Sequence, residues 1–210
     1  MKIAVVAATG KAGRKIVKEA KNRGFEVTAF VRKQAEIEGA DKVIVKDIFN
    51  LTKQDLEGFD AVVDAFGAWT PDTLEQHSTT LKHLCDVLSQ TKIRLLVVGG
   101  AGSLYVNKEH TATVSDGANF PDAFKPLAAA MAKALKELRT RMDVKWTYIS
   151  PAGDFQADGE RTGKYILGGE ELTLNSKNES IISYADYAIA MVDEIEKGNN
   201  IQKRISVVRQ

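Results

Sequence analysis

The opening segment of the chain constrains its fold more than any other part. Lys2–Val6 is an apolar run without alternating polar residues, which is typical of a parallel strand covered on both faces. A turn of small residues, Ala7–Gly13, follows at once, and apolar residues then recur at helical spacing from Ile16 until Gly24. This order of strand, tight turn and helix predicts the first half of a βαβ unit.

The turn after this strand has the composition of a phosphate cradle. Small side chains let the backbone approach a pyrophosphate, which the free N–H groups and the dipole of the following helix then hold. Ala7 occupies the first glycine position of a GxxGxxG pattern, and we expect the alanine to be tolerated there with a negative φ. The alternative is a tight βα turn that binds nothing. We predict that these turn residues bind a dinucleotide: Ala7, Thr9, Gly10, Lys11, Ala12 and Gly13.

Length and composition favour one globular domain over residues 1–210. The 210 residues are 44% hydrophobic, which suffices for a sizeable core, and the net charge of +1 indicates neither a nucleic-acid nor a membrane surface. We therefore expect a small-molecule partner. Cys85 is the one cysteine and stands on an apolar helical stripe, so we predict a buried thiol and no disulfide within the chain. No apolar run approaches the roughly 20 residues of a membrane span, and we expect a cytoplasmic protein.

The rest of the chain alternates strands with helices, which predicts an α/β fold. We expect a doubly wound parallel sheet with strand order 3-2-1-4-5-6-7 and a ligand at the carboxyl ends of the strands. Two long connections, 103–125 and 152–183, leave from that side and are predicted to form a substrate-facing lobe, with a short strand over 171–174. The other expected elements are helices over 72–89 and 126–141 and strands over 26–31, 42–45, 61–65, 95–98, 146–149 and 205–208.

Basic residues follow the second expected strand. An NAD-specific site places an acidic residue there, on the ribose hydroxyls, whereas this chain has Arg32 followed by Lys33. Arginine can pair bidentately with a 2′-phosphate and stack on adenine. Arg32 therefore predicts a preference for NADP(H), with NAD(H) as a possible second cofactor. The alternative is a solvated charge at a strand end.

Other strand ends carry further candidate cofactor contacts. Asp47 could accept from the adenine amine while Ile48 packs on the ring, and the small residues around Ala65 would let the backbone run beside a ribose. Trp69 could line the same pocket or cover the core. A glycine-rich turn ends at Ser103, whose hydroxyl is our candidate catalytic contact, although a serine in such a turn is also a common turn former. The predicted contacts after these strands are Asp47, Ile48, Ala65, Phe66, Gly67, Gly99 and Gly100.

These motifs together resemble the short-chain dehydrogenase/reductase superfamily. The chain is similar over its whole length to the atypical NAD(P)H-binding branch, which contains proposed NADH-flavin reductases and resembles biliverdin- and flavin-reductase-type proteins. This resemblance implies an NAD(P)-binding Rossmann fold. It rests on Ala7-Ala8-Thr9-Gly10-Lys11-Ala12-Gly13, Arg32, Asp47-Ile48, Gly99-Gly100-Ala101-Gly102-Ser103, Ser150-Pro151-Ala152 and Ile182-Ser183-Tyr184-Ala185-Asp186-Tyr187-Ala188.

One motif of the superfamily is missing. Ordinary members use a tyrosine four residues before a lysine to move a proton, but Ala129 stands four residues before Lys133, which we interpret as part of a solvated helix face. His110 could donate a proton, but a surface position is the better interpretation. The three histidines have no metal-ligand spacing, and no metal site is predicted.

The missing tyrosine restricts the reaction. Reduction of a ketone needs a proton at the developing alkoxide, whereas hydride transfer to a flavin delocalises the charge over the ring, so that orientation can replace acid–base chemistry. We therefore predict hydride transfer from NADPH to a flavin (FMN, FAD or riboflavin) or a similar conjugated acceptor. The alternatives are a dinucleotide-sensing regulator without turnover and, less favoured, an isomerase or epimerase. An aromatic wall for the acceptor is expected from Phe120, Phe124, Tyr105 and Phe155.

Overall fold

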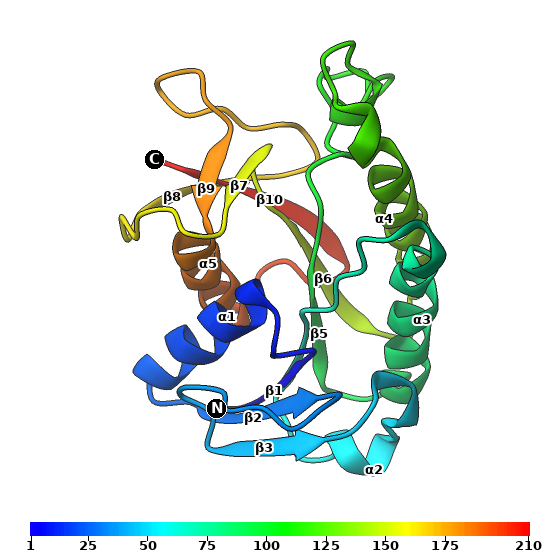
Figure 1. The fold of residues 1–210 in the computed structure, drawn as a ribbon, viewed down its shortest axis with the longest axis vertical. Coiled ribbons are helices and arrows are strands. Elements are labelled where there is room, and N and C mark those ends of the chain that lie inside the picture. Colours follow the sequence, from blue (N-terminus) through cyan, green and yellow to red (C-terminus); the bar gives the residue numbers. More distant parts are fainter.

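Seven parallel strands and one antiparallel edge strand form the central sheet (Figure 1). In the computed structural model, which describes residues 1–210, the strand order is β3-β2-β1-β4-β5-β6-β10-β8, and β8 is the antiparallel member. The predicted order 3-2-1-4-5-6-7 is confirmed, with β10 as the seventh strand. The strands are β1 Lys2–Val6, β2 Glu26–Val31, β3 Lys42–Val45, β4 Ala61–Asp64, β5 Arg94–Val98, β6 Lys145–Ser150, β8 Tyr165–Gly168 and β10 Lys203–Arg209.

Helices cover both faces of this sheet. Figure 1 shows α1 (Lys11–Asn22) and α5 (Tyr184–Lys197) on one side and α3 (Gln76–Leu88) and α4 (Lys125–Leu138) on the other. None of the helices combines the length and apolar composition that a bilayer-spanning segment needs. The short helical segments are α2 Lys53–Leu56 and the 3₁₀ turns Ile48–Asn50, Pro71–Thr73, Val114–Asp116 and Asp122–Phe124.

The apolar character of β1 explains why helices cover the sheet on both faces. Ile3 and Val5 belong to the core cluster under α1 and α5, while Ala4 and Val6 belong to the cluster under α3 and α4. Successive side chains of a strand point to opposite faces, so an unbroken apolar run buries both faces. Cys85 packs in the second cluster, where burial raises the pKa of its thiol to about 12, and the prediction of a buried thiol is confirmed.

The second long connection differs from its predicted structure. No strand forms over 171–174, where Glu171 makes only an isolated bridge to Tyr105. The edge strand is instead β8, whose apolar residues pair with Val207 and Val208 of β10. The segment bonds to the first long connection instead of to β10, because the Tyr105 N–H donates to the Glu170 carbonyl at 3.0 Å and the Leu172 N–H donates to the Tyr105 carbonyl at 2.8 Å, while the Glu170 side chain pairs with Arg204. A two-stranded parallel sheet, β7 (Asp154–Gln156) with β9 (Ile181–Ser183), was not predicted.

The expected helices are shorter than their apolar patterns. The region predicted as a helix over 72–89 divides into the 3₁₀ turn Pro71–Thr73 and α3, and α4 ends at Leu138 instead of residue 141. Thr70 precedes the turn without a side-chain cap and hydrogen bonds to Thr73 instead. This local geometry brings Thr70 and Thr73 to the rim of the cavity described below.

Candidate cofactor and active site

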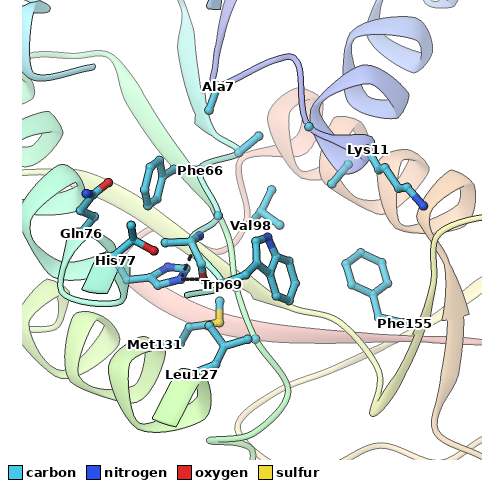
Figure 2. A pocket seen from close by; sticks show the side chains of 18 of the residues that line it. Ala7, Lys11, Phe66, Trp69, Gln76, His77, Val98, Leu127, Met131 and Phe155 are labelled. Atoms are coloured by element: carbon cyan, nitrogen blue, oxygen red, sulfur yellow. Dashed lines mark hydrogen bonds between the residues drawn. The ribbon is translucent and has the colours of Figure 1, made fainter. Parts of the chain in front are cut away.

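A cavity of about 970 Å³ opens at the carboxyl ends of the central strands. It runs from residues after β2 and β3, across the turn after β1, to residues after β5 and β6. The strand order reverses between β1 and β4, and ligands of doubly wound sheets bind at this switch point. Figure 2 shows that the side chains come from both halves of the chain, from Ala7 near its start to Phe155 in the second long connection.

The cavity brings together nearly all the predicted cofactor contacts. Gly13 is the one predicted contact that does not line it. A Cβ at Gly13 would lie 2.9 Å from the Cα of Ala8, so this glycine lets α1 pack against the turn after β1 and contributes indirectly. The predicted residues that line the cavity are Ala7, Thr9, Gly10, Lys11, Ala12, Arg32, Asp47, Ile48, Ala65, Phe66, Gly67, Gly99 and Gly100.

The N-terminus of α1 fits an anionic ligand. Gly10 is its N-cap with extended backbone, no side chain caps the helix, and no acidic residue stands in its first turn. The first N–H groups of a helix have no partner within it, and the helix dipole is positive at this end. The turn therefore has unpaired backbone donors of the kind that bind a pyrophosphate.

Ala7 has a conformation opposite to the one expected from the sequence. Its φ is +57°, in the left-handed region, where we had predicted a negative value. The cause is the tightness of the turn, because the Gly10 N–H donates to the Ala7 carbonyl at 3.2 Å and the Ala8 N–H donates to the Phe30 carbonyl at 3.3 Å. The first bond closes the turn and the second holds it beside β2, and the alanine carries a steric cost that a glycine would not.

We predict that Ala7→Gly stabilises the protein. Left-handed alanine costs about 1–2 kcal/mol, and the greater freedom of glycine in the unfolded chain offsets part of the gain, so a net increase of about 1 kcal/mol is expected. Urea denaturation at equilibrium measures it. The matched control is Ala8→Gly, a buried neighbour without a positive φ, which should lower the stability instead. A loss of stability in both variants would contradict the strain at Ala7.

Arg32 is the free cation at the β2–β3 end of the cavity. Three basic residues line the cavity, and two of them have carboxylate partners: Lys46 lies 2.7 Å from Asp55, and Lys11 lies 3.8 Å from Asp158. The exposed Arg32 guanidinium has no ion pair within the protein. Nearby, Asp47 caps the following 3₁₀ turn by accepting from the Phe49 N–H at 2.9 Å, and its second carboxylate oxygen has no protein partner.

Two packed side chains, Tyr148 and Met131, explain why glycines follow β5. A Cβ at Gly99 would overlap the Tyr148 ring, and a Cβ at Gly100 would lie 2.9 Å from the sulfur of Met131. The Gly100 N–H donates to the Tyr148 hydroxyl at 3.1 Å, and burial raises the pKa of Tyr148 to about 12. The two glycines thus let the backbone after β5 pack directly against the Tyr148 ring and the Met131 side chain. Neither position carries a side chain that would occupy the cavity.

Comparison with known proteins agrees with this geometry. The family model described as NAD(P)H-binding matches residues 7–197, which include the turn, Arg32 and both long connections. The chain belongs to the NAD(P)H-binding family. A Bacillus subtilis relative, the uncharacterized protein YwnB, is 44% identical over 212 residues, covering 100% of this chain and 99% of its own.

Solved structures of relatives support the assignment of this NAD(P)H-binding protein. A Streptococcus pneumoniae protein described as a candidate NADH-flavin reductase is 54% identical, with a TM-score of 0.97 and 100% coverage of both chains. A candidate epimerase from Bacteroides thetaiotaomicron is 32% identical, with a TM-score of 0.85 and coverage of 99% of this chain and 96% of its own. The Rossmann-type fold is therefore shared across relatives with different assigned chemistry.

Ser103 does not reach the ligand space of this NAD(P)H-binding protein. It is absent from the cavity wall, and its hydroxyl accepts a hydrogen bond from the Arg204 guanidinium at 3.0 Å. Arg204 is buried, also donates to the Ser103 carbonyl, and pairs with Glu170, so it joins the two long connections. The structure therefore gives Ser103 a partner in the scaffold, and its catalytic role stays a prediction that this geometry does not support.

Three other candidate residues also lie outside the cavity. Tyr105 stacks on His110 with ring centres 4.1 Å apart, and His110 contacts Glu171 at 2.7 Å. Lys133 pairs with Glu75 at 2.6 Å on the exposed face of α4, as its interpretation as a solvated lysine predicts. No three histidine, cysteine or carboxylate side chains converge as a metal site would require.

The end of the cavity beyond the glycines is built from aromatic and aliphatic side chains. In Figure 2, Trp69 stands in the middle of this end, with Phe155 to one side and Leu127 and Met131 to the other. The Trp69 side chain folds back over Gly67, yet the residue remains 70% exposed. Phe120 and Phe124 complete the wall, so the predicted aromatic residues other than Tyr105 line the cavity.

Sequence reasoning missed several residues of this end. Leu127 and Met131 line the cavity from α4, and their i, i+4 spacing in the sequence is equally typical of a helix stripe packed in the core. His77 lines the cavity with its Nε2 3.0 Å from the Ala68 carbonyl, and burial lowers its pKa, so the imidazole is neutral. Tyr184 packs on Phe155 with ring centres 3.9 Å apart.

Proposed function

We propose that this protein is an NADPH-dependent reductase that delivers hydride to a flavin or a similar planar conjugated acceptor. The family match supports a nicotinamide-dependent oxidoreductase, and the Streptococcus pneumoniae relative carries the name of a candidate NADH-flavin reductase. The observation that carries the proposal is the continuous cavity, in which a phosphate-binding turn leads into an aromatic wall. An acceptor ring bound against this wall would lie next to the nicotinamide end of the cofactor site.

The residues fit a nicotinamide dinucleotide. The α1 N-terminus would hold the pyrophosphate, Arg32 the 2′-phosphate and Asp47 with Ile48 the adenine. The glycines after β5 leave backbone space for the nicotinamide ring. When bound, the reduced nicotinamide supplies the hydride.

The protein's contribution to the reaction is orientation. Trp69 and Phe155 provide flat surfaces against which a ring can stack. No Tyr-Lys pair lines this end, and the neutral His77 imidazole is occupied by the Ala68 backbone. Burial raises the pKa of Tyr184, so its hydroxyl stays protonated and can donate a hydrogen bond to an acceptor. Such a site suits an electron-poor ring, which stabilises the transferred charge itself.

We predict that Arg32→Ala weakens NADPH binding by about 10–100-fold, because hydrogen bonds to charged groups contribute about 1.5–3 kcal/mol each. NADH has no 2′-phosphate and should bind the variant within about threefold of its original affinity. Titration of both cofactors by fluorescence or calorimetry measures the two constants. Lys33→Ala is the matched control, since Lys33 is its exposed neighbour but does not line the cavity. Equal NADPH affinities for the original protein and Arg32→Ala would remove the assignment of Arg32.

The proposed activity is tested by the loss of NADPH and NADH absorbance with and without FMN, FAD or riboflavin. The protein must first be freed of carried-over cofactor. Flavin-dependent oxidation that is faster with NADPH than with NADH is the expected result. Tight cofactor binding without oxidation by any acceptor would refute the reductase and favour a dinucleotide-sensing regulator.

A further inference from the structure

Asp158 places a carboxylate beside the turn at which the cofactor phosphates are expected. The Lys11 ammonium, from the first residue of α1, lies 3.8 Å from the Asp158 carboxylate. Lys11 lines the cavity, and in Figure 2 its side chain extends on the same side of the cavity as Phe155. Asp158 follows Phe155 in the second long connection. Its carboxylate therefore pairs with a cation that a pyrophosphate at this helix N-terminus would also attract.

A second observation places the Asp158 charge close to the cavity wall. Its neighbour Ala157 lines the cavity, and so does Tyr184 of α5. The pKa of the Tyr184 hydroxyl is raised by burial and, in addition, by the Asp158 carboxylate. The influence of a charge in salt solution fades within about 10 Å. Asp158 thus stands at the edge of the ligand space, next to side chains of its wall.

The segment that carries Asp158 is anchored at both ends. Before it, β7 pairs with β9. After it, the Thr162 and Gly163 N–H groups donate to the buried Asp186 carboxylate at 3.1 and 2.9 Å. Between these anchors a Cβ at Gly159 would lie 2.9 Å from two neighbouring side chains, so the turn is closely packed. These contacts keep the Asp158 carboxylate near the N-terminus of α1.

A pyrophosphate bound at this N-terminus would meet both members of the pair. It would gain the helix dipole and the Lys11 ammonium, but it would share that ammonium with Asp158 and would be repelled by the carboxylate. Both effects weaken the binding of an anion. The Lys11 and Asp158 side chains are 71% and 93% exposed, so solvent screens the interaction and its effect is moderate.

From this arrangement we propose that Asp158 is an affinity-determining residue of the cofactor site, which competes with the pyrophosphate for Lys11 and weakens the binding of NADPH and NADH alike. Arg32 differs, because its predicted contact is with the 2′-phosphate and distinguishes the two cofactors. The inference rests on the proposed position of the pyrophosphate and is independent of the acceptor. A weaker complex lets the oxidised cofactor dissociate faster, a step that limits the rate of many enzymes.

Asp158→Asn tests the proposal, since it removes the charge and keeps the shape of the side chain. It should tighten the binding of both cofactors by about fivefold at low ionic strength. The gain should nearly vanish at 1 M salt, where charges interact over only about 3 Å. Calorimetric titration with NADPH and with NADH measures the affinities. Glu160→Gln is the matched control, because Glu160 is exposed on the same segment, makes no ion pair and changes the net charge equally.

A second background separates competition for Lys11 from direct repulsion. In Lys11→Met the ammonium is absent, so only the repulsion between Asp158 and the pyrophosphate remains. The gain from Asp158→Asn should therefore fall to about half or less in this background, as a double-mutant cycle measures. A gain of the same size with and without Lys11 would overturn the competition.

The other outcomes separate this inference from the proposed function. A gain for both cofactors in Asp158→Asn that is absent from Glu160→Gln and lost at high salt would support it. An unchanged or lower affinity of Asp158→Asn would overturn it, and so would an equal gain in Glu160→Gln, which would show a general effect of net charge. The expected gain in a protein that reduces no flavin would support the inference and remove only the reductase. An original protein that binds neither cofactor would overturn the two together.

Discussion

Replacing Arg94 by methionine is expected to destabilise the protein by about 3–5 kcal/mol, the cost of breaking a buried ion pair. The Arg94 guanidinium lies 2.6 Å from Oε1 of Glu194, and the two side chains are only 11% and 5% exposed. Arg94 also donates to the Glu194 and Ile195 carbonyls, which are among the last of α5. The variant leaves Glu194 buried without its counter-ion, and equilibrium denaturation in urea measures the loss.

A double variant separates charge from hydrogen bonding. Arg94→Met with Glu194→Gln removes both charges. In the original protein the Asn200 amide donates to the Glu194 carboxylate at 2.7 Å, and the oxygen of a glutamine can still accept this bond. Buried pairs replaced on both sides are often nearly neutral, so the double variant should recover about half of the loss or more. A double variant as unstable as Arg94→Met alone would show that the bonds to the α5 carbonyls, and not the ion pair, dominate.

Asp64→Asn is expected to stabilise the protein at neutral pH by up to about 3 kcal/mol, reduced by the cost of burying the two amide N–H donors of asparagine. Asp64 ends β4, is 4% exposed and accepts one hydrogen bond, from the Phe66 N–H at 3.0 Å. Burial without a cation raises its pKa from 3.8 to about 6. Each unit of pKa difference between folded and unfolded states is worth about 1.4 kcal/mol, and asparagine keeps the acceptor without the buried charge.

The sign of the pH dependence follows from the direction of this shift. Between about pH 4 and pH 6 the folded protein holds the Asp64 proton more tightly than the unfolded chain, so the contribution of Asp64 to stability falls as the pH rises. The advantage of Asp64→Asn should thus be small at pH 4 and complete above pH 6–7. Asp72→Asn, on an exposed turn, is the control for the loss of one carboxylate without a change in the buried core. A pH-independent difference for Asp64→Asn would contradict the raised pKa.

The cofactor end of the cavity was predictable because its determinants are local. The turn Ala7–Gly13, Arg32 and Asp47 each stand directly after a strand with a clear apolar pattern, and parallel topology brings all carboxyl ends to one edge. The φ of Ala7 was predicted wrongly, because its sign depends on a hydrogen bond from Ala8 to Phe30 in the neighbouring strand. The sequence alone does not show that the Ala8 N–H and the Phe30 carbonyl lie within hydrogen-bonding distance.

The end of the cavity around Trp69 and Phe155 was predictable only in its general character. Aromatic residues in the long connections were expected to form a wall, but their spacing has no regular period that shows which of them face the cavity. Tyr105 stacks on His110 outside the cavity, whereas Phe155 lines it. Ser103 was assigned to the site from its place in the glycine turn. Arg204, 101 residues away, holds its hydroxyl instead.

The doubly wound sheet, the strand order from β3 to β10 and the tight turn after β1 could be predicted from the amino-acid sequence, because each follows from hydrophobic periodicity and from residues adjacent in the chain. The buried Arg94–Glu194 pair, the place of Ser103 and the aromatic wall around Trp69 became visible only in the tertiary structure. These features depend on which side chains distant segments present to one another. Such contacts arise from packing in three dimensions and leave no periodic signal in the order of the residues.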